Sequence, residues 1–230
     1  MTLKSWSAPC AGLPIRWFRI PCSFRVTATP GKAASGRVRF PVTQLWNGGG
    51  LFLAAATDLS GAWPTTEILI SKDAQRWRVL GGPRAFRGIV FGNDQFVVVG
   101  DNGAILTSSN GVDWSEQTSP ATTHLNAVEF GNGTFVAVGN SGTILSATNA
   151  INWVEPASGT ALNLSGVVFA DGLFAAVGGQ SVNSFLAGKR TDGVIVTSGD
   201  GMSWTVRRAA LNEGAPLDVA FGQGQFLSVG

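Results

Sequence analysis

Tyrosine is absent from this chain of 230 residues, histidine occurs once, and cysteine occurs twice, as Cys10 and Cys22. A single histidine cannot build a histidine-based metal cluster. Because both cysteines lie near the N-terminus, no disulfide or zinc framework holds the rest of the chain. Charged residues make up only 13% of the sequence. No apolar run reaches the roughly 18 residues that a transmembrane helix needs, so we expect no membrane span.

The few charges are unevenly distributed. Residues 1–40 hold seven Lys or Arg and no Asp or Glu, whereas residues 41–230 hold nine Lys or Arg and fourteen Asp or Glu, a net charge of −5. We call residues 1–40 the basic arm. Its cations are scattered among Pro, Trp and Phe, and no nucleic-acid-recognition motif accompanies them, so we expect no nucleic-acid partner. Pro9 and Pro14 interrupt the apolar core that a signal peptide would need.

Glycine is abundant, with 31 residues, and it recurs at a fixed interval. The segments RGIVFGNDQFVVVGDNGAILTSSNGVDW, from Arg87, and HLNAVEFGNGTFVAVGNSGTILSATNAINW, from His124, are copies of one repeat. Each copy opens on an aromatic residue before a Gly-rich turn and closes on a tryptophan. The opening aromatics are Trp46, Phe91, Phe130, Phe169 and Phe221, and the closing tryptophans are Trp77, Trp114, Trp153 and Trp204. The closing tryptophans lie 37, 39 and 51 residues apart, and four-stranded propeller blades use about 40–45 residues.

Within the third copy the spacing predicts four strands. They are expected at Leu125–Phe130, Thr134–Val138, Thr143–Ser146 and Asn152–Glu155. Gly and Asn between them supply the positive φ of tight hairpin turns. The second strand is apolar at nearly every position, which is typical of a strand buried between two neighbouring sheets. The sequence therefore predicts an all-β protein, a β-propeller of four-stranded antiparallel blades, with about four and a half blades present.

This reading divides the chain into an arm and a propeller. Residues 1–40 are expected to be poorly ordered or to add edge strands, and residues 41–230 to form blades near 42–80, 87–117, 125–156, 164–207 and, in part, 217–230. In one alternative the arm completes the fifth blade and closes a five-bladed ring. In the other, which we favour because the arm has no closing Trp turn, the propeller is truncated and further blades or domains belong to a longer protein.

The turn before each closing tryptophan has the form S-x-D-G-x-x-W. The copies are Ser71–Trp77, Ser108–Trp114, Ala147–Trp153 and Ser198–Trp204, with Asp73, Asn110, Asn149 and Asp200 at the third position. Asp or Asn there bonds its own backbone two residues on, and the tryptophan fills the space between sheets. Residues 42–230 thus resemble the Asp-box (bacterial neuraminidase repeat) propellers, and are similar to the photosystem II assembly and stability factor and sortilin repeats. The resemblance implies a structural role for these residues, and a location that is extracellular, periplasmic or on the cell surface.

A second resemblance is confined to one tetrapeptide. Phe18-Arg19-Ile20-Pro21 matches the F/Y-R-I-P motif of sialidases, which implies that Arg19 would clamp a substrate carboxylate. The catalytic tyrosine of that family has no counterpart here, and residues 1–40 offer no Asp as a general acid. We therefore assign no catalytic residue, no metal and no cofactor.

Two connections between second and third strands are enlarged. They are Thr57–Thr66 and Gly179–Asp192, whereas the corresponding connections in the other copies are the three residues of 101–103 and 140–142. Insertions concentrate on the binding face of repeat arrays, although neutral drift is an equal alternative because surface loops tolerate insertion. His124 is interpreted as a solvated residue on the loop that enters the third copy. The candidate ligand-binding residues on this rim are Trp63, Arg84, His124, Phe185, Lys189 and Arg190.

The sequence therefore predicts a non-catalytic β-propeller that binds a protein or a glycan. A fragment of a sialidase-type glycoside hydrolase and a purely structural repeat array are the two alternatives, and fold alone does not separate them.

Overall fold

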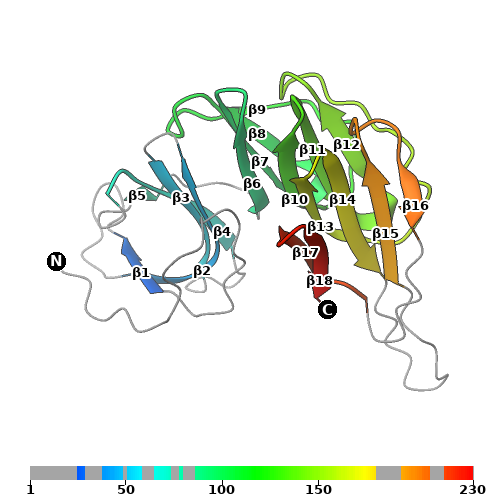
Figure 1. Ribbon diagram of the computed structural model, residues 1–230. Helices are drawn as coiled ribbons and strands as arrows, with labels where there is room; N and C mark the ends of the chain where they lie inside the picture. The colour runs from blue at the N-terminus through cyan, green and yellow to red at the C-terminus, as the bar shows by residue number, and fades with distance from the viewer. Residues whose placement is uncertain are drawn as a thin grey trace, which may run out of the picture. The chain divides into compact units, whose positions relative to one another are not determined.

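The computed structural model describes residues 25–28, 38–48, 51–58, 65–73, 78–79, 86–179, 193–207 and 215–229. These residues form strands and two single-turn 3-10 helices (Figure 1). The elements are β1 (Arg25–Ala28), β2 (Val38–Gly48), β3 (Leu51–Asp58), β4 (Thr65–Ser71), β5 (Arg78–Val79), β6 (Phe86–Gly92), β7 (Gln95–Gly100), η1 (Asp101–Gly103), β8 (Ile105–Ser108), β9 (Ser115–Glu116), β10 (Leu125–Gly131), β11 (Thr134–Gly139), η2 (Asn140–Gly142), β12 (Ile144–Ala147), β13 (Leu164–Ala170), β14 (Leu173–Gly179), β15 (Gly193–Ser198), β16 (Thr205–Arg207), β17 (Asp218–Gly222) and β18 (Gln225–Val229). The chain divides into two compact units, Met1–Phe86 and Arg87–Gly230.

The first unit contains one antiparallel sheet in the order β1-β2-β3-β4-β5. The long strand β2 has two partners in succession: its residues 38–41 pair with β1, and its residues 42–48 pair with β3. Ala54 on β3 and Leu69 on β4 are buried. The second and third strands of the first repeat copy therefore carry buried apolar side chains.

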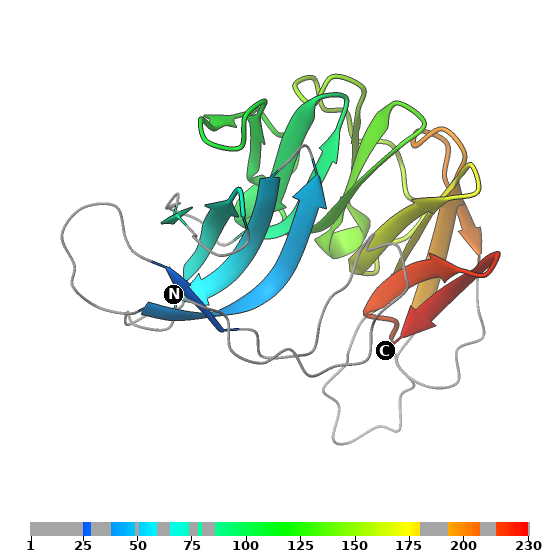
Figure 2. The same cartoon turned by 60° about the vertical axis from the view of Figure 1, so that its left-hand side comes forward.

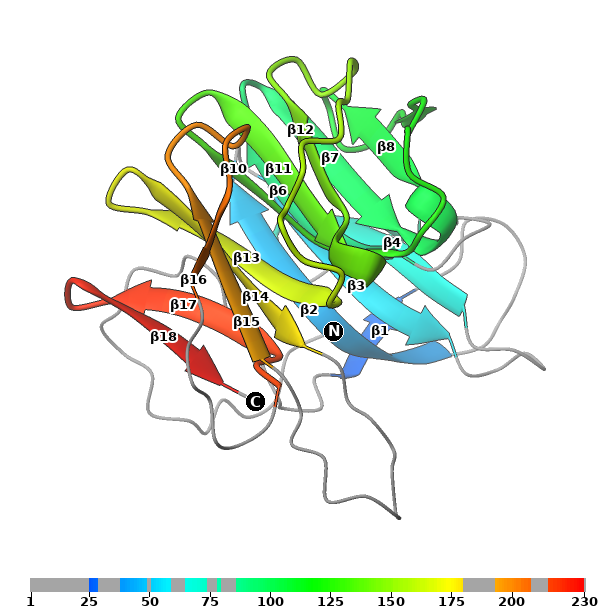
Figure 3. The same ribbon diagram turned by 90° about the vertical axis from the view of Figure 1, so that its right-hand side faces the viewer.

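The second unit contains four antiparallel sheets, one for each later copy of the repeat. Their strand orders are β6-β7-β8-β9, β10-β11-β12, β13-β14-β15-β16 and β17-β18. The first strands of neighbouring sheets lie side by side, since β10 contacts β13 and β13 contacts β17 (Figures 1 and 3). The sheets of this unit thus follow one another face to face, in the order of the sequence (Figure 2).

One predicted strand is much shorter than expected. The fourth strand of the third copy, predicted at Asn152–Glu155, is reduced to a single bridge between Ser146 and Val154. The backbone N–H of Asn152 donates to the Asn149 side chain in the preceding turn, at 2.9 Å, and is not available for pairing. Pro156 follows shortly and has no backbone N–H to offer. Few backbone groups between Asn152 and Pro156 remain free to pair with β12, so only the one bridge forms.

The hairpins between first and second strands are built on consecutive residues with positive φ. The pairs are Asn93-Asp94, Asn132-Gly133, Asp171-Gly172 and Gln223-Gly224, with φ between 47° and 76°. Two such residues in a row form the turn whose twist matches that of the flanking strands. The Gly and Asn punctuation of the sequence therefore marks the hairpins.

The core lies between the sheets. On β11, Phe135 and Ala137 belong to a cluster shared with the β6–β9 sheet, whereas Val136 and Val138 belong to a cluster shared with the β13–β16 sheet. All four side chains are fully buried. The second strand of the third copy is therefore sandwiched between two sheets, which is what its unbroken apolar sequence predicts.

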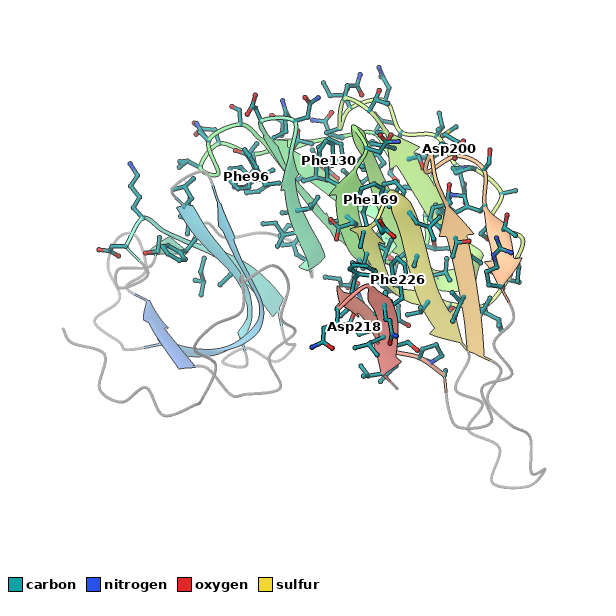
Figure 4. All side chains as sticks on the ribbon, viewed as in Figure 1. Phe96, Phe130, Phe169, Asp200, Asp218 and Phe226 are labelled. Atoms are coloured by element: carbon teal, nitrogen blue, oxygen red, sulfur yellow. The ribbon has the colours of Figure 1, made fainter. Side chains whose placement is uncertain are left out.

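Aromatic rings and glycines fit together where neighbouring sheets meet. A Cβ atom on Gly92 would lie 2.1 Å from Cγ of Phe130, and one on Gly131 would lie 2.0 Å from Cγ of Phe169. Each ring therefore lies on the bare backbone of the preceding sheet (Figure 4). The same ring also packs on the buried phenylalanine of its own second strand, with Phe130 and Phe135 centroids 4.5 Å apart. Phe130 and Phe169 are thus intersheet spacers.

The closing tryptophans are less uniform than the sequence predicts. Trp153 is buried at 7% exposure and belongs to the cluster between the β6–β9 sheet and the β10–β12 sheet. Trp114 and Trp204 are only half-buried, and Trp77 lies outside the described residues. Among these residues the two-stranded β17–β18 sheet follows the sheet of Trp204 and contacts its inner strands β13 and β14. The sequence predicts that every closing tryptophan fills the space between sheets, and the half-buried Trp114 and Trp204 do so less completely than Trp153.

Candidate ligand-binding rim

The sheets of the second unit have two distinct ends. One end carries the first-to-second hairpins and the turns that precede the tryptophans, and there the amide of Asn93 donates to the Thr148 carbonyl at 3.5 Å. The other end carries η1, η2 and the connections between successive sheets, and there the Asn102 N–H donates to Nδ1 of His124 at 3.2 Å. We name them the turn rim and the loop rim. Both enlarged connections join a second strand to a third, as η1 and η2 do.

On the turn rim, the Asp and Asn oxygens are occupied by their own turns. Oδ1 of Asp200 accepts hydrogen bonds from the N–H groups of Met202 at 2.8 Å and Ser203 at 2.7 Å. The Ser198 hydroxyl donates to the same oxygen at 2.9 Å. The backbone N–H groups of Ser203 and Met202, followed by the Ser198 hydroxyl, lower the pKa of Asp200 to about 2. The carboxylate therefore holds the turn in its ionised form.

The neutral turns reproduce this geometry. Oδ1 of Asn110 accepts from the N–H groups of Val112 and Asp113 at 2.8 and 2.9 Å, and Oδ1 of Asn149 accepts from Ile151 and Asn152 at 3.0 and 2.9 Å. The three closing tryptophans that the structure describes donate the indole N–H to the turn, at 3.2 Å from Trp114, 3.0 Å from Trp153 and 3.1 Å from Trp204. In the first unit, the Ser71 hydroxyl donates to Asp73 at 3.0 Å. A carboxylate is not required for the turn, which is inconsistent with a shared acid–base role.

On the loop rim, three charged or titratable side chains meet. Nε of Arg87, at the start of β6, lies 2.6 Å from Oδ1 of Asp101 in η1. Nδ1 of His124 lies 3.2 Å from the same oxygen. Their side chains are 42%, 26% and 40% exposed, respectively. His124 is therefore not a freely solvated loop residue, because it fastens the entry of the third copy to η1 of the second.

The next junction has the same connections in neutral form. The amide of Asn126 donates to Oδ1 of Asn140 at 2.9 Å, as Arg87 does to Asp101. The Ser141 N–H donates to Oδ1 of Asn163 at 2.9 Å, as Asn102 does to His124. Asn163 precedes β13 by one residue, and His124 precedes β10 by one residue. The contacts of Arg87 with Asp101 and of Asn102 with His124 are thus repeated at the next junction by neutral residues. We call this set of contacts the intersheet latch.

The other candidate ligand-binding residues lie outside the described residues. These are Trp63, Arg84, Phe185, Lys189 and Arg190, and the Phe18–Pro21 tetrapeptide with Arg19 also lies outside them.

Sequence reasoning missed three polar residues. Arg87 and Asp101 were not singled out, although their counterparts in the next copy, Asn126 and Asn140, are also polar. Glu129 occupies a β10 position at 5% exposure, where the neighbouring copies have Val90 and Val168. Its Oε1 accepts a hydrogen bond from the Phe130 N–H at 2.9 Å. An acidic residue in an otherwise apolar register was the available signal.

Within the described part of the chain, no group of three or more His, Cys, Asp or Glu side chains is placed to hold a metal ion. The same residues include no helix with the length and apolarity of a membrane span.

Comparison with known proteins places the fold. No family model matches the chain, and no curated protein matches it. The structure of YCF48 bound to D1 peptide superposes with a TM-score of 0.53 at 14% identity, over 77% of this chain and 56% of that one. YCF48 from Cyanidioschyzon merolae gives 0.47 at 14% identity over 82% and 77% of the two chains, and arabinanase Arb43A from Bacillus subtilis gives 0.42 at 14% over 81% and 78%. The chain has the β-propeller fold, and it spans little more than half of the first of these structures.

Proposed function

We propose that this chain is a non-catalytic β-propeller module that binds a protein or a glycan at its loop rim. The proposal is carried by the contrast between the two rims. On the turn rim, the Asp and Asn oxygens of the repeated turns accept hydrogen bonds from their own turns. The loop rim holds the half-exposed Arg87 and His124. The enlarged connection Gly179–Asp192 joins a second strand to a third, as η1 and η2 do on this rim. Ligand contacts concentrate on such loops when a rigid scaffold holds them.

The repeat class belongs to the same proposal. The turns that end at Trp114, Trp153 and Trp204 combine an Asx side chain that caps two backbone N–H groups with an indole that closes the turn. We assign them to the Asp-box class on this basis. YCF48, whose structure shares the fold, was solved with a bound peptide, and a protein segment is accordingly one of the two ligand classes proposed here.

Binding of the full chain to a glycan array and to a peptide array tests the proposal. We expect at least one ligand whose binding falls about tenfold or more, or by ~1.4 kcal/mol, in Trp63→Ala or in the Lys189→Ala/Arg190→Ala double variant. Asp200→Asn is the matched control on the turn rim, because Asn occupies the same position in the turns of Asn110 and Asn149. Loss of binding in this folded control, with the loop-rim variants unchanged, would show that the wrong rim was chosen.

A hydrolase assay separates the alternative. The full chain is incubated with a fluorogenic sialoside, with Arg19→Ala as the paired variant. Turnover that Arg19→Ala abolishes would replace the binding proposal with the sialidase-type reading, since Arg19 is the residue that the tetrapeptide matches to the carboxylate clamp.

A further inference from the structure

An apolar residue recurs at one exposed position of the turn rim. It is the fifth residue of the turn that ends at each closing tryptophan, and the second, third and fourth copies have Val112, Ile151 and Met202 there. These residues are 40%, 50% and 48% exposed. We call them the apolar row. The sheet before Ile151 is flanked on both sides, since its strand β10 contacts β7 and β13, so the exposure of Ile151 does not come from an end of the second unit.

Each residue of the apolar row is held in place by its own turn. Its backbone N–H donates to the Asp or Asn oxygen of that turn, at 2.8 Å from Val112, 3.0 Å from Ile151 and 2.8 Å from Met202. The residue just before each of them is buried. An exposed side chain on a backbone that is already ordered loses less conformational entropy when a partner covers it. The apolar row is therefore well suited to binding.

Neighbouring turns of this rim are connected. The amide of Asn93, in the β6–β7 hairpin, donates to the Thr148 carbonyl in the turn of Ile151 at 3.5 Å. The amide of Asn132, in the β10–β11 hairpin, donates to the Gly199 carbonyl in the turn of Met202 at 3.4 Å. Each of these hairpins thus contacts the turn of the next sheet, and the apolar row crosses a surface made by hairpins and turns in alternation.

Negative charge surrounds the apolar row. Four exposed carboxylates lie in the hairpins and turns of this rim, and Figure 4 labels one of them: Asp94, Asp113, Asp171 and Asp200. Among the described residues of the second unit, the only Lys or Arg are Arg87, on the loop rim, and Arg207, at the end of β16. Such a surface attracts a cationic partner. It repels nucleic acid, anionic lipid and a second copy of itself, because each of these brings more negative charge.

We propose that the apolar row is a docking surface for a cationic protein segment. Apolar side chains of the segment cover Val112, Ile151 and Met202, and its Lys or Arg side chains lie beside the carboxylates of the hairpins and turns. Burial of the apolar side chains supplies most of the affinity, and the charges favour this partner over others and speed its association. The surface is separate from the loop rim and independent of the function proposed there.

A synthetic peptide tests the docking surface. The heptapeptide Leu-Lys-Arg-Leu-Lys-Arg-Leu is titrated into the full chain by calorimetry, and we expect binding. Glutamine at all three positions of the apolar row should weaken it at least about tenfold, or ~1.4 kcal/mol. The first copy has Gln75 at this position, so glutamine is compatible with the turn. Val154→Gln is the matched control, because Val154 is 48% exposed but pairs with Ser146 outside the turn, and it should bind like the parent chain.

Two altered peptides leave the protein unchanged. Serine in place of the leucines should abolish binding, and so should glutamate in place of the cations. On the protein, Asp94→Asn combined with Asp171→Asn should weaken binding and reduce its dependence on salt. Both variants keep a residue type that accepts positive φ, as Asn93 and Asn132 do in the hairpins.

Four outcomes would overturn the proposal. They are absence of binding to the parent chain, equal affinity of the parent and the triple glutamine variant, undiminished binding of the serine peptide, and self-association of the free chain that the triple variant lacks, which would assign the apolar row to a second copy. The single variant Ile151→Gln gives the same comparison if the triple variant does not fold. Trp63→Ala should leave peptide binding unchanged, and a loss there would instead place the peptide on the loop rim.

Discussion

Substitution of Gly131 by alanine tests how the sheets are spaced. The new Cβ would lie 2.0, 2.2 and 2.5 Å from three ring carbons of Phe169 on the next sheet. Ordinary carbon contacts are about 3.5–4.0 Å, so the ring must move by roughly 1.5 Å. No positive φ is involved at Gly131, and the cost is therefore steric.

The magnitude follows from what the ring must leave. Insertion of a methyl group into a packed region costs about 1–3 kcal/mol. The displaced ring also weakens its contact with Phe174, whose centroid is 4.6 Å away, and such aromatic pairs contribute about 0.5–1.5 kcal/mol. Phe169 is only half-buried, so it has some room to move. We expect Gly131→Ala to destabilise the second unit by about 2 kcal/mol, which lowers the Tm by about 4–8 °C.

Urea denaturation of the full chain, read by hydrogen exchange of the β11 and β14 amides, measures this locally. Gly199→Ala is the matched control, since its Cβ would meet nothing within 4 Å, and we expect a change within about 0.5 kcal/mol. In a Phe169→Ala background, Gly131→Ala should cost less than about 0.5 kcal/mol, because the clash is gone. Ala170 occupies the equivalent position of the next junction, so alanine is accepted at one position of this kind. A cost at Gly131 below about 0.5 kcal/mol in the parent chain would mean that the Phe169 ring shifts freely there too. That result would refute the argument that Gly131 sets the spacing of the sheets.

The sequence predicted the sheets well because their signals are local. From its phenylalanine onward, strand two of the second, third and fourth copies is apolar without interruption, and the hairpins carry residues such as Asn132 and Gly133 that accept positive φ. Four-stranded antiparallel units of a β-propeller follow from these two patterns and the repeat period. The fourth strand of the third copy was predicted too long because it depends on which backbone groups the Asn149 turn already uses, and no residue pattern reports that.

The candidate rim was harder to predict because its contacts join distant residues. Arg87 and Asp101 are 14 positions apart, and Asn102 and His124 are 22 apart. The Asn102–His124 bond crosses from one copy to the next, and the Arg87–Asp101 pair joins the first strand of one copy to its second-to-third connection, so residue spacing shows neither. The usable signal was positional: His124 and Asn163 each precede the first strand of their copy by one residue. A comparison of copies at that position would have predicted a shared intersheet bond for both.

Three further outcomes test the packing, the turn and the latch. Trp153→Ala should cost about 3–5 kcal/mol by denaturation of the full chain, the scale of a buried large aromatic, and a loss below about 1 kcal/mol would exclude an intersheet role. Because the folded-state pKa of Asp200 is lowered from 3.8 to about 2, its stabilising effect is present above pH 4 and is lost as the pH falls from about 4 to 2. Asp200→Asn should remove this part of the acid sensitivity in exchange measured on β15, and an unchanged profile would contradict the assignment. His124→Ala should cost about 1 kcal/mol, because it removes the acceptor of the Asn102 N–H. His124→Asn should cost less than about 0.5 kcal/mol, because Asn163 makes the equivalent bond at the next junction. Equal losses in the two variants would mean that the imidazole stabilises the loop rim through a contact other than the hydrogen bond from the Asn102 N–H.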